Sequence, residues 1–89
     1  SEGFLKLWAD LTPELRVVTR MLAERQQAIT GQAGSDRAAE LGQAMTTSQI
    51  QTRLNTLTRN GIADKLGRER VLTDPAFAAW VRERPADEF

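Results

Sequence analysis

The chain has 89 residues, of which 40% are hydrophobic, and its 12 Lys and Arg side chains balance 12 Asp and Glu, so its formal net charge is zero. This length predicts one small domain with a single core and without a deep substrate cleft. The absence of Cys and His removes thiol nucleophiles, the commonest general base and nearly all transition-metal ligand sets. We therefore expect a protein that is not an enzyme and that holds no metal or cofactor.

Three further absences narrow the function class. No apolar run approaches the roughly 18 residues that a membrane-spanning helix needs, and the first residues lack the pattern of a signal peptide. Together with the lack of disulfides, this favours a cytoplasmic protein with no membrane partner. No Gly-x-x-x-x-Gly-Lys-Ser/Thr loop occurs, so the chain has no phosphate-cradling motif of its own.

Residues 1–12 are an apolar segment that is short enough to be a helix or an arm. As an arm, its exposed apolar side chains would pack on a neighbouring domain or on a second copy; these are Leu5, Trp8 and Leu11. A helix is expected to start at Pro13, because Thr12 can cap it and Pro is favoured in a first turn. Its core-facing stripe contains Leu15, Val18, Met21, Leu22 and, further along, Ile29, while Arg16, Arg20, Glu24 and Gln27 take the other side.

The next segment predicts a loop and a short helix. Residues 30–35 carry two Gly and indicate a loop, with a short edge strand at residues 28–30. Ser35 or Asp36 can cap a helix that Gly42 ends. Residues 43–45 then turn into the following helix, as in a helix-turn-helix unit.

The strongest helix signal begins at Thr46. Thr46 and Gln49 form a Thr-x-x-Gln capping box, and apolar residues then repeat on one helical face at Ile50, Leu54 and Leu57. Asn60 and Gly61 supply a left-handed C-terminal cap, and Ile62 stands where a Schellman motif places a contact back onto the helix. The helix is therefore expected to end at about residue 59.

A hairpin is expected directly after this helix. Residues 62–65 and 70–73 flank a Gly-containing turn at residues 66–69. A helix-turn-helix followed by a hairpin is typical of a winged helix-turn-helix. We therefore predict a mainly α fold with a small β-hairpin, in which residues 13–84 form a three-helix core, a wing and a C-terminal helix.

The last helix is expected to start at Asp74 and Pro75, which repeat the cap-and-Pro pattern. Its inner stripe contains Phe77, Trp80 and Val81, and Pro85 is expected to stop it. Residues 85–89 are then a frayed tail. Trp8 and Trp80, near the two ends of the chain, are expected to pack together and close the domain.

Two stretches go beyond a generic winged helix. Residues 7–18 (LWADLTPELRVV) resemble the LW…L(T/S)PEER-V pattern at the start of one type of winged-helix domain. Residues 71–82 (VLTDPAFAAWVR) resemble the last segment of the same type of domain, which contains Asp-Pro and ends with a Trp. From about Phe4 to Arg84 the chain resembles the winged-helix domain at the C-terminal end of AAA+ and STAND-type ATPases, including archaeal-type ATPases. The resemblance implies a piece of a longer ATPase, with contacts to its nucleotide-binding module or to another protein.

Three interpretations of the helix 46–59 and the hairpin remain open: a solvated surface, a protein contact, and a site for double-stranded DNA. In a helix-turn-helix the second helix reads the major groove, where Gln and Arg bond base edges and Ser or Thr bond phosphate. The candidate DNA or partner contacts are Ser48, Gln49, Thr52, Arg53, Thr56 and Arg59 on the helix and Lys65, Arg68 and Arg70 on the hairpin.

Overall fold

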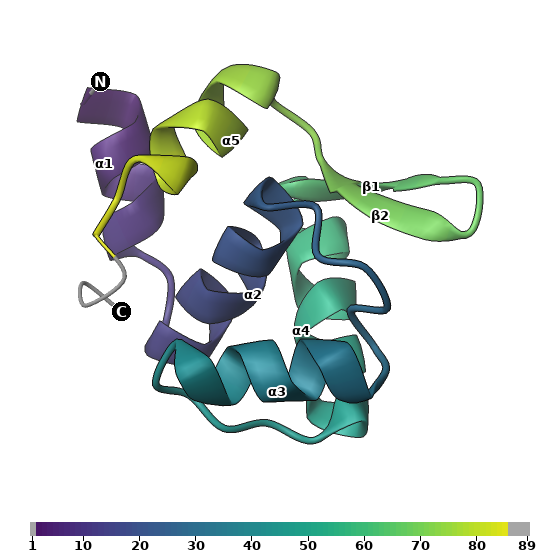
Figure 1. Ribbon diagram of the computed structural model, residues 1–89. Coiled ribbons are helices and arrows are strands. Elements are labelled where there is room, and N and C mark those ends of the chain that lie inside the picture. The colour runs from purple at the N-terminus through teal and green to yellow at the C-terminus, as the bar shows by residue number, and fades with distance from the viewer. Residues whose placement is uncertain (1, 86–89) are drawn as a thin grey trace.

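The computed structural model describes residues 2–85, which form five helices and one two-stranded antiparallel hairpin (Figure 1). The helices are α1 (Glu2–Ala9), α2 (Pro13–Ala23), α3 (Gln32–Glu40), α4 (Thr47–Arg59) and α5 (Pro75–Arg82), and the strands are β1 (Ala63–Leu66) and β2 (Glu69–Leu72). This arrangement confirms the expected helix-rich fold with a small hairpin. Most of the predicted tail, residues 86–89, lies outside the described residues.

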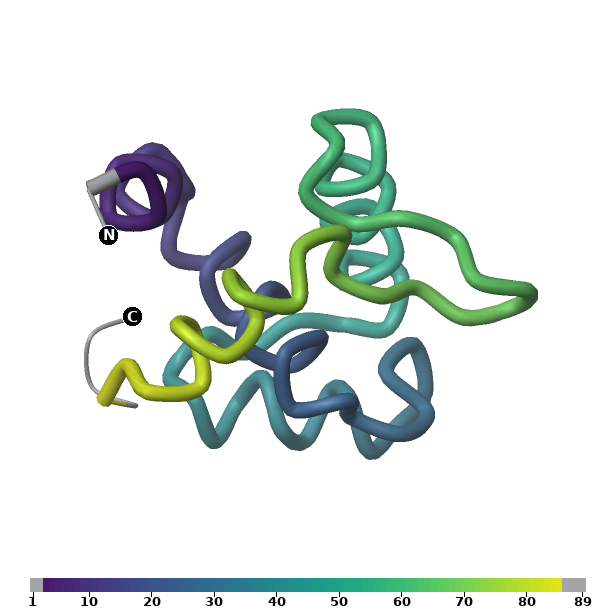
Figure 2. The backbone as a smooth tube through the Cα atoms, turned by 90° about the horizontal axis from the view of Figure 1, so that it is seen from above, coloured from purple at the N-terminus to yellow at the C-terminus, as the bar shows by residue number. Residues whose placement is uncertain are grey.

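Helix α2 lies at the centre of the molecule. It contacts α3, α4, α5 and β2, and α4 also contacts α3 and β1. Seen from above, α1 and α5 lie on one side while the hairpin projects on the other (Figure 2). The core is a single cluster that includes the fully buried Val17, Val18, Met21, Ile50, Leu57 and Val81.

Helix α2 starts as expected but ends early. Thr12 Oγ1 accepts a hydrogen bond from the Leu15 N–H at 3.3 Å, so the predicted cap is confirmed. The helix stops at Ala23 because Arg25 turns into the left-handed region (φ 56°). The Gln26 N–H then reaches back to the Met21 carbonyl at 3.0 Å, which is a Schellman bond made without glycine. The stripe predicted to run on to Ile29 is therefore interrupted.

The prediction of a short edge strand at residues 28–30 is wrong. Residues 27–30 form turns, with Ala28 at φ 50°. The Ala28 carbonyl accepts bonds from the N–H groups of Gly31 (2.8 Å) and Gly34 (3.2 Å), both at the start of α3. This segment is therefore bonded to α3 rather than to the hairpin, whose sheet has only two strands within residues 2–85.

Helix α3 begins earlier than Ser35 or Asp36, the caps that the sequence suggests. Its N-cap is Gly31, and Ser35 lies inside the helix. The Ser35 hydroxyl donates to the Met45 carbonyl at 2.7 Å, which ties α3 to the turn before α4. The end at Gly42 (φ 94°) is confirmed.

Helix α4 follows its local sequence signals. The capping box is complete, because Thr46 Oγ1 accepts from the Gln49 N–H (3.1 Å) and Gln49 Oε1 accepts from the Thr46 N–H (2.9 Å). The stripe of Ile50, Leu54 and Leu57 is buried. Gly61 (φ 77°) and the bond from the Ile62 N–H to the Leu57 carbonyl (3.0 Å) complete the Schellman motif.

The hairpin is tighter than expected. Leu66 pairs with Glu69, so the turn is only Gly67–Arg68 and not residues 66–69. Gly67 has φ 64°, the conformation that a type II′ turn requires at its first central position. The strands consequently reach one residue further toward the turn on each side.

Residues 2–11 form a helix and a turn, and they are not an exposed arm. Trp8 and Leu11 are core residues, 5% and 7% exposed, whereas Leu5 is 55% exposed. The Trp8 and Trp80 rings meet edge to face with centroids 6.0 Å apart, so the predicted Trp contact is confirmed. The α1 helix is thereby joined to α5.

Helix α5 starts as the sequence predicts and ends before Pro85. Asp74 Oδ1 accepts from the Ala76 N–H at 2.8 Å, and Pro75 occupies the first turn. The helix ends at Arg82 with Glu83 as its C-cap, two residues before Pro85.

Candidate functional site

The structure brings the outward face of α4 and the hairpin together, as a contact surface built from both would require. Helix α4 contacts β1. From β2, the Arg70 guanidinium donates to Thr58 Oγ1 at 2.9 Å and to Asn55 Oδ1 at 3.2 Å, both on α4. The exposed candidates are Ser48, Gln49, Thr52, Arg59, Lys65 and Arg68, and the half-buried ones are Arg53, Thr56 and Arg70.

Arg53 is not a free cation on this surface. Its Nη2 lies 3.0 Å from Oε2 of Glu14, in the first turn of α2, and the two side chains are 28% and 37% exposed. The carboxylate neutralises the guanidinium and holds it against α2. Sequence reasoning missed this partner because the two residues are 39 positions apart.

The hydroxyl and amide groups of α4 are also partly occupied. Thr52 Oγ1 donates to the Ser48 carbonyl at 3.1 Å, and Thr56 Oγ1 donates to the Thr52 carbonyl at 3.2 Å. The side-chain oxygen of Gln49 accepts the capping bond. The face that α4 presents is therefore polar, with much of its hydrogen bonding satisfied by the helix itself.

Four cations of the candidate set have no carboxylate partner within residues 2–85; one of them, Arg70, donates to α4 instead, and the other three are Arg59, Lys65 and Arg68. Lys65 and Arg68 lie on the hairpin and are exposed. Arg59, near the end of α4, makes one long hydrogen bond of 3.4 Å to Thr56 Oγ1. These three side chains are the part of the predicted site that could meet phosphate.

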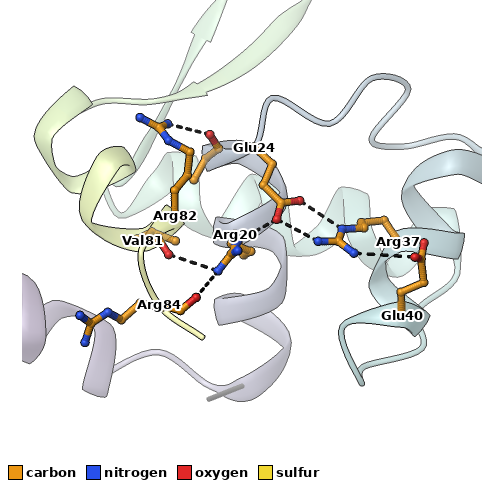
Figure 3. Close-up of polar contacts among 8 residues, drawn as sticks. Arg20, Glu24, Arg37, Glu40, Val81, Arg82 and Arg84 are labelled. Carbon is orange, nitrogen blue, oxygen red and sulfur yellow. Dashed lines mark hydrogen bonds and ion pairs between the residues drawn. The ribbon is translucent and has the colours of Figure 1, made fainter. Parts of the chain in front are cut away.

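A second polar cluster joins α2, α3 and α5 (Figure 3). Glu24 accepts bonds from Arg20 Nε at 2.8 Å and from two nitrogens of Arg37 at 2.9 and 3.1 Å. Arg20 Nη1 also donates to the carbonyls of Arg84 (2.6 Å) and Val81 (3.3 Å) at the end of α5. The cluster is a clamp between helices, and every oxygen of Glu24 is already engaged.

This clamp corrects the expectation that Arg20 and Glu24 simply take the side of α2 away from the core. Their side chains are only 14% and 23% exposed. Helix α3 covers that side of α2 and supplies Arg37, 13 positions from Glu24. Helical periodicity could not reveal the contact, because it describes one helix at a time.

The clamp predicts acid sensitivity. Burial raises the pKa of Glu24, but the hydrogen bonds and charges of Arg37 and Arg20 outweigh it, so the pKa lies below its ordinary value of 4.5. A carboxyl whose pKa is lowered by folding stabilises the protein above its unfolded-state pKa and loses that contribution as the pH falls through its folded-state pKa. We expect the free energy of unfolding to decrease over that acidic range.

Urea unfolding at a series of pH values measures this effect. Glu24→Gln should lower the free energy of unfolding by about 1–3 kcal/mol at neutral pH and should flatten its acid dependence. Glu40→Gln is the matched control, because that carboxylate is 65% exposed and lies 3.7 Å from Arg37. Equal acid dependence in wild type and Glu24→Gln would contradict the assignment.

Several site classes find no support in the described part of the chain. No cluster of three or more Asp or Glu side chains in residues 2–85 is arranged to hold a metal ion. None of the helices in that range combines the length and apolar character needed to cross a bilayer. Comparisons with protein-family models, curated proteins and solved structures returned no match to this chain.

Proposed function

We propose that this chain is a non-catalytic winged-helix module, a cytoplasmic accessory domain from the C-terminal part of a larger ATPase, which serves protein or intramolecular contacts and regulation. The order α2, α3, α4, hairpin, α5 supports it, as do the sequence resemblances at residues 7–18 and 71–82. Both resembling stretches contribute to the core through Trp8 and Phe77. A fold supports many functions, so the surface must decide between them.

The observation that carries the protein-contact function is the small number of free cations on the α4 face. A DNA-reading helix needs cations that can reach phosphate and release counterions. Here Arg53 is neutralised by Glu14, and the Arg70 guanidinium donates hydrogen bonds to Thr58 and Asn55. A polar surface with few free charges resembles a protein interface, which is depleted of charged residues at its core and polar at its rim.

DNA binding is the second candidate, favoured by Arg59, Lys65 and Arg68. These cations are exposed, and none has a carboxylate partner within residues 2–85. In this alternative α4 enters the major groove with Gln49 and Thr52, and the hairpin meets the backbone.

A titration of the purified domain with mixed-sequence duplex DNA, followed by amide NMR shifts over a salt series, separates the two. We expect no saturating shifts at low ionic strength. Shifts confined to residues 48–59 and 65–70 that vanish with added salt would overturn the protein-contact function. In that case Arg68→Ala should weaken all sequences alike and reduce the salt slope by about 1.

The ATPase context has its own test. In the complete gene product, deletion of residues 1–85 should change nucleotide turnover or assembly, because an accessory module acts through its contacts with the nucleotide-binding part. Unchanged turnover and assembly, or a gene product with no nucleotide-binding module, would overturn this part of the proposal.

A further inference from the structure

The outer edge of β2 is an open strand edge. Paired residues of an antiparallel ladder alternate between hydrogen-bonded and non-bonded positions. The Thr73 N–H donates to the Ile62 carbonyl at 3.0 Å, which makes that pair a bonded one. By the observed register, Asp64–Val71 is then also bonded, whereas Arg70 and Leu72 direct their N–H and C=O groups away from β1.

Nothing in residues 2–85 occupies these outward groups. No hydrogen bond in that range reaches the backbone N–H or C=O of Arg70 or Leu72 from outside the hairpin. The segment at residues 28–30, where an edge strand was expected, bonds to α3 instead. An unpaired strand edge is a template for an added strand.

An open groove of about 660 Å³ runs along this edge. Residues 69–72 of β2 form one wall, residues 25–30 form part of another, and α5 contributes Ala78 and Arg82. Figure 2 shows the segment after α2 and the hairpin on the same side of the molecule. The groove therefore lies where a third strand would pair with β2.

The charge of the groove is strongly one-sided. Its charged lining residues are Arg25, Arg68, Arg70 and Arg82, against the single acid Glu69. Arg25 and Arg68 are exposed, and neither side chain has a hydrogen-bond or ion-pair partner in the described part of the chain. A groove of this composition on a chain of zero net charge selects an acidic occupant.

The floor of the groove is apolar, which points to a peptide rather than to a nucleic acid. The buried Leu22, Leu54 and Leu72 line it, and Leu66 at the hairpin end is 64% exposed. A phosphate backbone makes no use of an apolar floor. Successive side chains of a strand point to opposite faces, so one peptide can place acids toward the Arg groups and apolar residues toward the floor.

We propose that this groove binds an extended acidic peptide segment of a partner protein, which adds a strand to the open edge of β2. The backbone groups of Arg70 and Leu72 supply the hydrogen bonds, and Arg25 and Arg68 pair with acidic side chains. The inference rests on the proposed protein-contact function and names the chemistry of the partner.

The probe is an acetylated peptide of about six residues, the usual length of a strand, that alternates glutamate and valine. At physiological salt, where screening extends over about 8 Å, we expect saturating amide shifts at residues 25–30 and 69–72 and slowed exchange of the Arg70 and Leu72 N–H groups. The same peptide with lysine in place of glutamate should not bind.

Two N-methylated versions of the peptide test strand addition directly. One carries methyl groups on its valine amides and the other on its glutamate amides, and their charges are the same. In a strand only alternate amides face the neighbouring edge, so one version should lose binding and the other should keep it. Equal binding of both versions would overturn strand addition.

Protein variants test the role of the cations. Arg25→Glu combined with Arg68→Glu should weaken the glutamate–valine peptide by at least about tenfold. Lys65→Glu is the matched control, because Lys65 lies on the same hairpin but does not line the groove. Equal weakening by Lys65→Glu, or no binding by the wild type, would overturn the inference; the proposed function fails separately, on DNA shifts or on the deletion.

Discussion

Gly34→Ala is expected to destabilise the protein by about 3 kcal/mol, although alanine is normally the better helix former by about 1 kcal/mol. Gly34 is buried in α3. A methyl group there would overlap the backbone oxygen of Ile29 and lie 2.5 Å from its carbonyl carbon. The obstacle is backbone, so the segment 25–31 would have to move away from α3. Urea unfolding followed by circular dichroism measures the loss.

Gly3→Ala is the matched control for this prediction. Gly3 is also helical, in α1, and nothing lies within 4 Å of the position its Cβ would take. That substitution should stabilise the protein by about 0.4–1 kcal/mol. If Gly34→Ala is neutral or stabilising as well, the close packing of residues 28–31 on α3 is wrong, and with it one wall of the groove beside β2.

Phe77→Ala is expected to cost about 4 kcal/mol of the free energy of unfolding. Phe77 is 2% exposed, its ring centroid is 5.4 Å from that of Phe4, and it stacks on Trp80 at 6.0 Å. Removing it opens a cavity between α1 and α5. Because small domains are stable by only about 5–15 kcal/mol, this single change should remove a large share of the stability.

Thermal and urea unfolding of Phe77→Ala and two further variants test whether the loss of stability follows the burial of the side chain. Trp80→Ala should cost about 3 kcal/mol, since Trp80 is half-buried and contacts the rings of Trp8 and Phe77. Leu66→Ala, at a side chain that is 64% exposed, should stay within about 0.5 kcal/mol of the wild type. A loss below about 1 kcal/mol for Phe77→Ala would show that the aromatic cluster does not hold α1 to α5.

The parts of the fold that could be predicted are those with local signals. The capping box at Thr46, the Schellman motif at Gly61 and the cap at Asp74 each involve groups within about five positions, and all three are confirmed. The end of α2 could not be predicted, because the left-handed residue there is Arg25 and not the glycine that usually marks a helix end. The prediction of a strand at residues 28–30 was wrong because a strand forms only beside a partner strand, and the local sequence does not show whether one is within reach.

The candidate site was predictable only as a set of surface positions. Helical spacing correctly placed Ser48, Gln49, Thr52 and Arg59 on the exposed face of α4. It could not show that Arg53 pairs with Glu14, because residues on two different helices have no fixed spacing in the sequence. The same holds for Arg70, whose charge lies against α4.

By itself, the sequence determined the type of most elements, many of their ends and the absence of Cys and His chemistry, because caps, turns and periodicity act over a few residues. Only the tertiary structure decided which charges are neutralised and which strand edge stays open. Those outcomes depend on how α2, α3 and the hairpin pack against one another. Long-range contacts therefore paired Arg53 with Glu14, held Arg70 against α4, and left a groove where an edge strand was expected.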